Sequence, residues 1–286
     1  MISSDKPAKG IIAMIIAVAM FSAMDAAMKA LTPYYSAMQI TCLRGLFAWP
    51  LVLLWLISTG QAKYLLQARW SLHVLRAVLG IVMLASFVFS LKTLSLGDAY
   101  AIFFSCPLLI TVLSVWWLKE KVAPRHWVAI GVGLATVIYM LKPDTGQFLS
   151  IGALAALVAA FCYAVSAITV RVLAKSDTSG NMVFWLMTFL IIGAGALSWP
   201  VWQPLQSGLW HYFLVIGVTG FIGQICLTEA FKLAPASVIA PFEYTALLWG
   251  IGFDILLWQQ WPALSLLIGA AIIMSSGLYL LFQERR

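Results

Sequence analysis

Apolar residues run through this chain in long blocks, and short polar segments separate the blocks. About 20 apolar residues cross the hydrocarbon core of a bilayer as one helix, so each block has the length of a membrane-spanning helix. The predicted spans are 10–31, 36–58, 72–92, 97–118, 126–142, 150–173, 182–202, 209–231, 236–258 and 263–282. The fifth is short, which leaves nine spans as the alternative. We therefore expect an all-α polytopic membrane protein with ten transmembrane helices.

The two halves of the chain share a pattern of glycine, proline, aromatic and basic positions. The pairs 138 residues apart are Gly97 with Pro235, Pro124 with Pro262 and Gly131 with Gly269. The pairs 142 residues apart are Gly10 with Gly152, Phe21 with Tyr163 and Lys29 with Arg171. We predict two five-helix repeats, 1–145 and 146–286. Because five is odd, the second repeat enters the membrane from the opposite side, and such inverted repeats are typical of secondary transporters.

Composition and charge support a membrane location. Hydrophobic residues make up 63% of the 286 positions and charged residues 9%, against about 25% charged in soluble domains. With the N-terminus in the cytoplasm, thirteen Lys and Arg residues fall in cytoplasmic segments and three in outer loops. This bias predicts that both termini are cytoplasmic. It also accounts for the net charge of +7, so we expect the lipid bilayer and not nucleic acid as a partner.

Motifs for catalysis or cofactor binding do not stand out. The chain has no phosphate-binding glycine loop with lysine, no zinc-protease helix motif and no serine nucleophile elbow. His73, His126 and His211 lie near span ends and form no metal cluster, and the four cysteines lack metal-site spacing. The sequence therefore predicts no enzyme, no catalytic residue, no cofactor and no metal.

Charged residues inside the predicted spans are the candidates for function. An ionised side chain at the centre of a bilayer costs about 2.5–3.5 kcal/mol on the insertion scale, so it must be paired or face water. The residues in question are Asp25, Arg44, Glu229, Glu243 and Asp254.

Glu243 follows Pro241 near the start of its span, and we expect it to face a central cavity; fixing the helix kink is the alternative role. Arg44 either pairs with Asp25 or meets a substrate carboxylate, which its guanidinium fork matches. Lys29, one turn beyond Asp25, competes for the same acid. Glu229 lies at the cytoplasmic end of its span, where we expect an interfacial anchor, an ion-pair partner or a gate.

Two prolines interrupt equivalent spans of the two halves, namely Pro107 and Pro241. Each removes a helix hydrogen bond and bends its span. Membrane helices tolerate proline, yet paired interruptions in corresponding spans also point to a binding site. Aromatic residues at similar depth predict a cavity that accepts apolar or aromatic groups, although each also fits core packing. They are Tyr100, Phe104, Tyr163, Trp185, Tyr244 and Trp249.

The chain resembles the EamA type of the drug/metabolite transporter superfamily over nearly its whole length. The stretches that carry the resemblance are LSLGDAYA at 94–101, WLKEKV at 117–122 and APASVIAPFEYT at 234–245. The resemblance implies an exporter of small metabolites with a central cavity between the repeats; such exporters include those of amino acids, aromatic ones among them, and of toxic compounds. One departure is that Glu120 of the first half corresponds to Trp258 in the second.

Together these features predict a secondary transporter that exports amino acids or related small metabolites across the bacterial inner membrane by alternating access. The expected cavity residues are Glu243, Tyr244, Tyr100, Trp185, Arg44, Phe104 and Tyr163. Glu243 or Asp25 would carry a coupling proton, because removal from water favours the neutral carboxyl. Alternatives are a multidrug or toxic-compound exporter and, from a different class, a lipid or lipid-linked-sugar flippase. The sequence is compatible with a monomer and does not define an oligomeric state.

Overall fold

The structure is a computed structural model that describes residues 5–66, 68–103, 105–119 and 150–262, with scattered positions between 124 and 139 and between 264 and 275. Within these residues all regular structure is helical. Six helices are long and apolar enough to cross a membrane. They are α1 (Asp5–Leu31), α2 (Ala37–Ser58), α3 (Trp70–Ser90), α7 (Ile151–Leu173), α8 (Ser179–Ser198) and α9 (Trp210–Leu233). The predicted all-α membrane class is confirmed.

Shorter elements complete the described chain. The predicted spans 97–118 and 236–258 are each divided, the first into α4 (Leu96–Phe103) and α5 (Cys106–Leu118), the second into α10 (Ala236–Ile239), η6 (Ala240–Thr245) and α11 (Ala246–Trp258). The 3-10 turns η1 (Gln61–Tyr64), η4 (Trp199–Val201) and η5 (Ser207–Leu209) lie in connections. The predicted spans 126–142 and 263–282 fall largely outside the described residues, so the count of ten stays a prediction.

Helix ends recur at equivalent places in the two halves. Ser36 caps α2 by accepting a hydrogen bond from the Gln39 N–H, and Thr178, 142 residues later, caps α8 in the same way. At the other end, α5 and α11 each stop at a residue in the left-handed conformation, Lys119 with φ 55° and Gln259 with φ 56°. The local stop and start signals of the sequence are thus duplicated as well.

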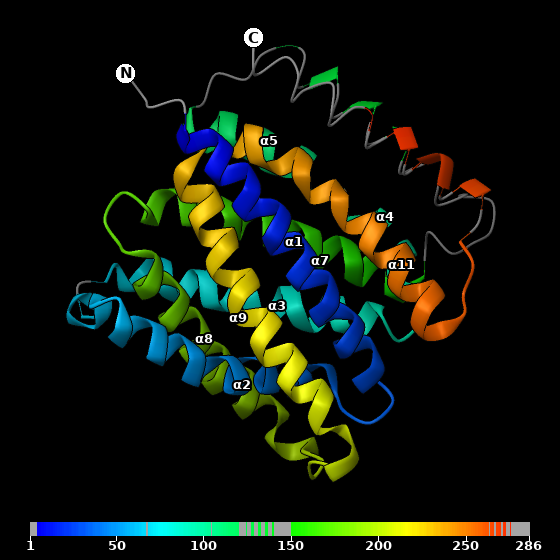
Figure 1. Ribbon diagram of the computed structural model, residues 1–286, viewed down its shortest axis with the longest axis horizontal. Helices are drawn as coiled ribbons and strands as arrows, with labels where there is room; N and C mark the ends of the chain where they lie inside the picture. The colour runs from blue at the N-terminus through cyan, green and yellow to red at the C-terminus, as the bar shows by residue number, and fades with distance from the viewer. Residues whose placement is uncertain are drawn as a thin grey trace.

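The long helices pack in a pattern that pairs the halves (Figure 1). The most extensive contacts join α1 to α9, α3 to α7 and α2 to α8. If α1 corresponds to α7 and α3 to α9, the first two contacts are equivalent and α2–α8 lies on the axis that relates them. This arrangement fits two inverted repeats. The predicted boundary at 145/146 lies outside the described residues and stays a prediction.

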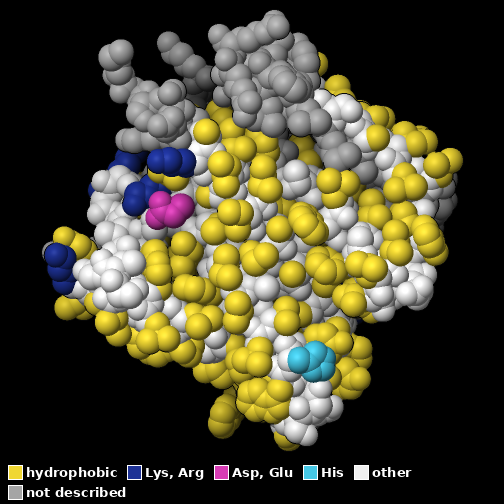
Figure 2. All heavy atoms as spheres, in the orientation of Figure 1, with side chains coloured by type: hydrophobic (Ala, Val, Ile, Leu, Met, Phe, Trp, Pro, Cys, Tyr) yellow, Lys and Arg dark blue, Asp and Glu magenta, His cyan; other side chains and the backbone are white. Residues whose placement is uncertain are grey.

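The outer surface is apolar. Large side chains such as Trp116, Ile151 and Leu256 are 76%, 74% and 73% exposed. Figure 2 shows a face covered mainly by hydrophobic side chains, with Lys and Arg gathered toward one edge. A water-soluble monomer rarely exposes so much apolar surface, and lipid is the solvent that suits it.

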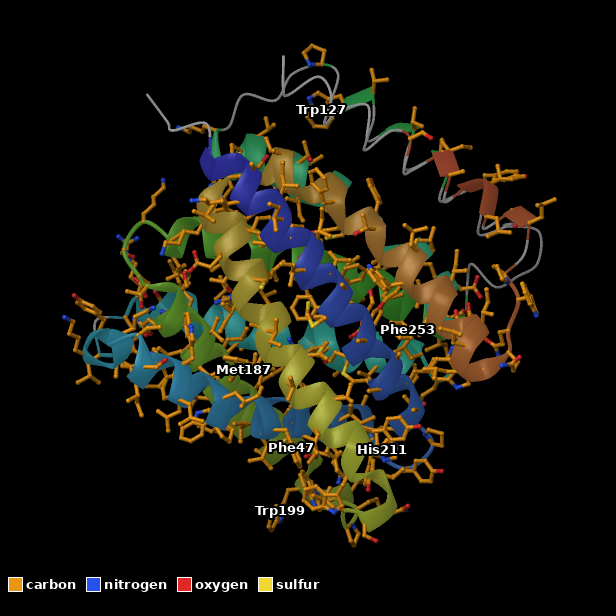
Figure 3. The ribbon with its side chains drawn as sticks, viewed as in Figure 1. Phe47, Trp127, Met187, Trp199, His211 and Phe253 are labelled. Carbon is orange, nitrogen blue, oxygen red and sulfur yellow. The ribbon has the colours of Figure 1, made fainter. Side chains whose placement is uncertain are left out.

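Glycines bring α9 close to its neighbours. A Cβ atom on Gly217 would lie 2.9 Å from the backbone carbonyl carbon of Phe47 on α2, a residue labelled in Figure 3. One turn further on, Gly220 faces Met24 and Arg44, and Gly223 faces Phe21. This glycine face lets α9 pack directly on α1 and α2, as small residues do between membrane helices.

Candidate functional site

The divided spans bring irregular backbone to the middle of the bundle. Pro107 lies in the first turn of α5, directly after the interruption that follows α4. Pro241 lies in the first turn of η6, a 3-10 segment between α10 and α11. Proline suits a helix start because its missing N–H would have no partner there. Both breaks sit where the sequence places them, in corresponding spans of the two halves.

A cavity of about 130 Å³ opens beside these breaks. Its walls come from α1, α2, α3, α4, α7, α8, α9, η6 and the start of α11, and so from both predicted repeats. Most of the lining is apolar, including Met83, Phe87 and Phe103. The polar side chains that line it are Ser22, Asp25, Arg44, Arg76, Tyr100, Tyr163, Ser166, Gln224 and Glu243.

Two hydrogen bonds, each between a tyrosine and an acidic residue, lie in the wall of the cavity. The Tyr100 hydroxyl of α4 donates to Asp25 Oδ2 of α1 over 2.8 Å. The Tyr163 hydroxyl of α7 donates to Glu243 Oε1 of η6 over 2.9 Å. Both acidic residues are 8% exposed. The two pairs occupy corresponding spans with the roles exchanged. In the first pair the acid is on α1 and the tyrosine on α4, whereas in the second the tyrosine is on α7, which corresponds to α1, and the acid is on η6.

Two arginines also reach the cavity. Arg44 is 2% exposed and donates from Nη2 to Gln224 Oε1 of α9 over 3.2 Å. Its guanidinium carbon lies 5.6 Å from the centre of the Phe21 ring, within range of a cation–π contact. Arg76 is 1% exposed and donates from Nη1 to the Met182 carbonyl of α8 over 2.9 Å.

The predicted Asp25–Arg44 salt bridge is not formed. The two salt-bridge contacts among the described residues are Lys29–Asp254 and His73–Asp177, and the second is ionic only when His73 is protonated. Lys29 therefore does not pair with Asp25 one turn away either, and Asp254, for which the sequence offers no partner, has one. Asp25 uses a tyrosine hydroxyl instead, which leaves the charge of Arg44 without an acidic partner in contact.

The remaining predicted cavity residues are placed differently. Trp185 donates from Nε1 to the Leu65 carbonyl and packs edge-on against Trp70, so it lies outside the cavity lining and the neighbouring Leu186 takes that place. Tyr244, 6% exposed, packs in an apolar cluster with Tyr100 and Leu247 and does not line the cavity. Phe104 lies outside the described residues.

Glu229 also lies apart from the cavity. It is half-buried near the end of α9 and belongs to neither of the two salt bridges of the described residues. Its predicted role as an anchor or gate stays a prediction.

Arg76 and Gln224 are among the polar cavity residues that sequence reasoning misses, together with Ser22 and Ser166. Arg76 counts toward the cytoplasmic bias in the topology argument, yet it lies in the second turn of α3 with its side chain turned inward. Its position inside the predicted span 72–92 is the signal that identifies it, because a charge there needs a partner or a cavity. Gln224 carries no charge and gives no such signal.

A polar network joins three helices at one end of the bundle. Lys29 Nζ of α1 lies 2.9 Å from Asp254 Oδ1 of α11 and 4.4 Å from the centre of the Trp258 ring. Asp254 also accepts the backbone N–H groups of Leu96 and Gly97, the first residues of α4. We call this the Lys29–Asp254 network. Glu120, the residue to which Trp258 corresponds, lies outside the described residues.

The residues described hold no group of three or more His, Cys, Asp or Glu that would ligate a metal. His73 and Asp177 form a buried pair, with Nε2 and Oδ2 2.7 Å apart, that ties the start of α3 to the segment between α7 and α8. This pair has a structural place between helices and does not line the cavity.

Fold and cavity together define a polytopic helical membrane protein with a charged internal cavity. The sequence matches the EamA-like transporter family twice, over residues 8–142 and 150–282, and the chain belongs to this family. Similar proteins are named as transporters, so the protein is a small-molecule transporter and not an enzyme.

Three of these relatives are distant but extensive matches. The pseudopaline exporter CntI of Pseudomonas aeruginosa is 25% identical, covering 93% of both chains. The riboflavin transporter of Vibrio cholerae is 27% identical over 79% of this chain and 76% of its own. The S-adenosylmethionine uptake transporter of Rickettsia conorii is 24% identical over 93% of this chain and 90% of its own.

A solved crystal structure is similar to this chain in fold. The TM-score is 0.77, the match covers 98% of both chains, and the sequence identity is 18%.

Proposed function

We propose that the protein is a secondary transporter that exports amino acids or related small metabolites across the bacterial inner membrane by alternating access, with both termini in the cytoplasm. The observation that carries the proposal is a cavity formed between helices of both predicted repeats and lined by buried charged groups. Buried charges inside a membrane protein mark substrate or ion pathways, since they cost free energy that function must justify.

The small volume of the cavity supports alternating access. About 130 Å³ is close to the size of an engineered protein cavity that holds one benzene. A metabolite larger than this fits only after the helices around the cavity move apart. The interruptions at α4–α5 and α10–α11 supply short segments beside the cavity that can move without unfolding a whole helix.

The proposed substrate class and the proposed proton coupling are inferred from the residues that line the cavity. Apolar and aromatic walls suit an apolar side chain, and the charged groups suit the ends of an amino acid. The named relatives act on riboflavin, S-adenosylmethionine and pseudopaline, which favours a metabolite over a lipid. Their names include both export and uptake, so the direction of transport rests on the family resemblance. Asp25 or Glu243 carries the coupled proton in this scheme.

Counterflow in liposomes tests the proposal. Purified protein is reconstituted with unlabelled compound inside, and entry of the radiolabelled compound is followed for the amino acids, S-adenosylmethionine and riboflavin. Transient accumulation of an amino acid supports the proposal. Counterflow only of cationic dyes would replace it with a multidrug exporter, and lipid scrambling without counterflow would replace it with a flippase.

A further inference from the structure

Two buried guanidinium groups face the cavity without an acid in contact. Arg44 and Arg76 are 2% and 1% exposed, and neither belongs to a salt bridge of the described residues. They stand on different helices, α2 and α3, and their charges are near enough to act on each other. Two like charges held together away from water are unfavourable unless an anion joins them.

Both arginines keep donor capacity for a ligand. Each uses one nitrogen in a protein hydrogen bond, Arg44 with Gln224 and Arg76 with the Met182 carbonyl. The Nε atom of each is buried with no hydrogen-bond partner in the part of the chain that the structure describes. Because a guanidinium offers five N–H donors in a planar fork, the donors that these hydrogen bonds leave unused can bind an oxyanion.

The two cavity acids are engaged elsewhere. Asp25 accepts from Tyr100 and Glu243 accepts from Tyr163, and neither is within salt-bridge distance of an arginine. Asp25 and Arg44 are near enough for their charges to attract, so the cavity holds acidic and basic groups close together without an ion-pair contact between them. Such a lining suits a substrate that carries both a carboxylate and a donor or positive group.

We propose that the cavity selects metabolites by a carboxylate group, which Arg44 and Arg76 recognise together. The inference rests on the proposed transport function and names its substrate class. A carboxylate matches the guanidinium fork in shape and carries one charge. A phosphate ester carries up to two charges and meets repulsion from Asp25 and Glu243, which line the same space. Gly220 of α9 gives the Arg44 side chain room, since a Cβ atom there would lie 3.4 Å from Arg44 Nε.

Matched ligands test the carboxylate requirement. L-phenylalanine, L-leucine and S-adenosylmethionine carry a carboxylate; L-phenylalaninamide, L-leucinamide and riboflavin do not, and phenyl phosphate offers a different oxyanion. Each is assayed by counterflow in liposomes and by the shift it gives to the thermal unfolding midpoint of the purified protein. We expect at least one carboxylate to be active in both assays, and its amide to bind about 30-fold more weakly or worse.

Variants identify the residues. R44Q and R76Q should each raise the half-saturating concentration of the active carboxylate by about 30-fold or more and leave any residual response to the amide unchanged. R44K and R76K keep the charge but lose the fork, and should weaken binding less. K175Q removes one positive charge from an exposed side chain and should leave both assays unaltered. If a glutamine variant does not fold, the lysine variant of the same position decides.

The outcomes separate the inference from the proposed function. Equal activity of amides, riboflavin or phenyl phosphate, or R44Q and R76Q that bind carboxylates normally, overturns the inference while transport stands. Arginine-dependent thermal shifts by carboxylates without any counterflow overturn transport and leave the binding site. Absence of both responses for every compound overturns both.

Discussion

At the scale of single residues, the cavity wall is organised by which polar group each charge contacts. Asp25 and Glu243 each accept from a tyrosine hydroxyl, while Arg44 and Arg76 each bind a neutral oxygen, an amide in one case and a backbone carbonyl in the other. Neutral partners orient a charged side chain without cancelling its charge. The cavity thus keeps charged groups positioned and available.

The Tyr163 hydroxyl stabilises the fold through Glu243, and Y163F should show this. The phenylalanine keeps the ring contact with Phe103 but leaves the buried carboxyl without its donor. Loss of a partner for a buried polar group costs about 1–3 kcal/mol. We expect a lower thermal unfolding midpoint for the purified variant. Y34F, at a tyrosine that is 47% exposed, should leave the midpoint unchanged, and an unchanged midpoint in Y163F would contradict the role.

Glu243 is a candidate for the coupled proton, and E243Q tests it. An amide of the same shape cannot take up a proton, so a transporter coupled through Glu243 should lose its response to an imposed pH gradient. Counterflow, which needs no net proton movement, should persist in E243Q. A normal rate and a normal pH dependence in this variant would exclude Glu243 as the carrier, and D25N would then be the next test.

Sequence reasoning finds several cavity residues one by one but not their partners. Of the predicted cavity residues, Arg44, Tyr100, Tyr163 and Glu243 line this cavity, and so does the coupling candidate Asp25. The Asp25–Tyr100 and Tyr163–Glu243 bonds span 75 and 80 positions of the chain, and the choice of partner depends on how the helices pack. Helix rotation likewise decides that Trp185 turns toward Leu65 and away from the cavity.

At the scale of helices, the Lys29–Asp254 network joins α1, α4 and α11 at one end of the cavity. Asp254 combines an ion pair with two backbone N–H groups at the start of α4, where the helix dipole favours a negative charge. The predicted topology places this end outside the cell. Helices of both predicted repeats meet here, so under the proposed alternating access an opening of this end would break the network.

D254N should therefore be destabilising. The side chains of Lys29 and Asp254 are 11% and 7% exposed, and removal of one partner from a buried pair costs about 3–5 kcal/mol, less where water reaches it. We expect a lower thermal unfolding midpoint. We also expect side chains at this end to react faster with a labelling reagent that cannot cross the membrane. K29M combined with D254N should cost less than the sum of the two single changes. D98N serves as control, because the side-chain hydrogen bond of Asp98 joins it to Ser95, three residues earlier at the same helix start, and does not link two helices.

Helix packing on α9 depends on Gly217. A methyl group there would meet the Phe47 backbone carbonyl carbon and oxygen at 2.9 Å, which only a shift of α2 from α9 relieves. G217A should lower the unfolding midpoint, although alanine favours a helix by about 1 kcal/mol over glycine. G252A on α11 meets no atom within 4 Å and should be neutral or slightly stabilising. Equal midpoints for the two variants would contradict close packing at Gly217.

At the scale of the whole molecule, the sequence predicts the helix limits and the repeat more completely than it predicts single side-chain contacts. Span length and polar breaks depend on local composition, so the limits of α1, α2, α7 and α9 agree with the predicted spans to within a few residues, apart from the earlier start of α1 at Asp5. The repeat is visible because the same stop and start signals occur twice. What the sequence does not show is the cavity, which exists only once both halves pack.

The last prediction concerns the membrane topology, which decides whether the number of spans is even or odd. Ten spans place both termini on the same side, whereas nine would place them on opposite sides. Lys and Arg in the loops favour the cytoplasm for the N-terminus, even without Arg76, which the structure buries inside α3. Reporter fusions at each end, one active only in the cytoplasm and one only outside, should both indicate the cytoplasm. A C-terminal fusion active outside would establish an odd number of spans and remove the basis for two inverted five-helix repeats.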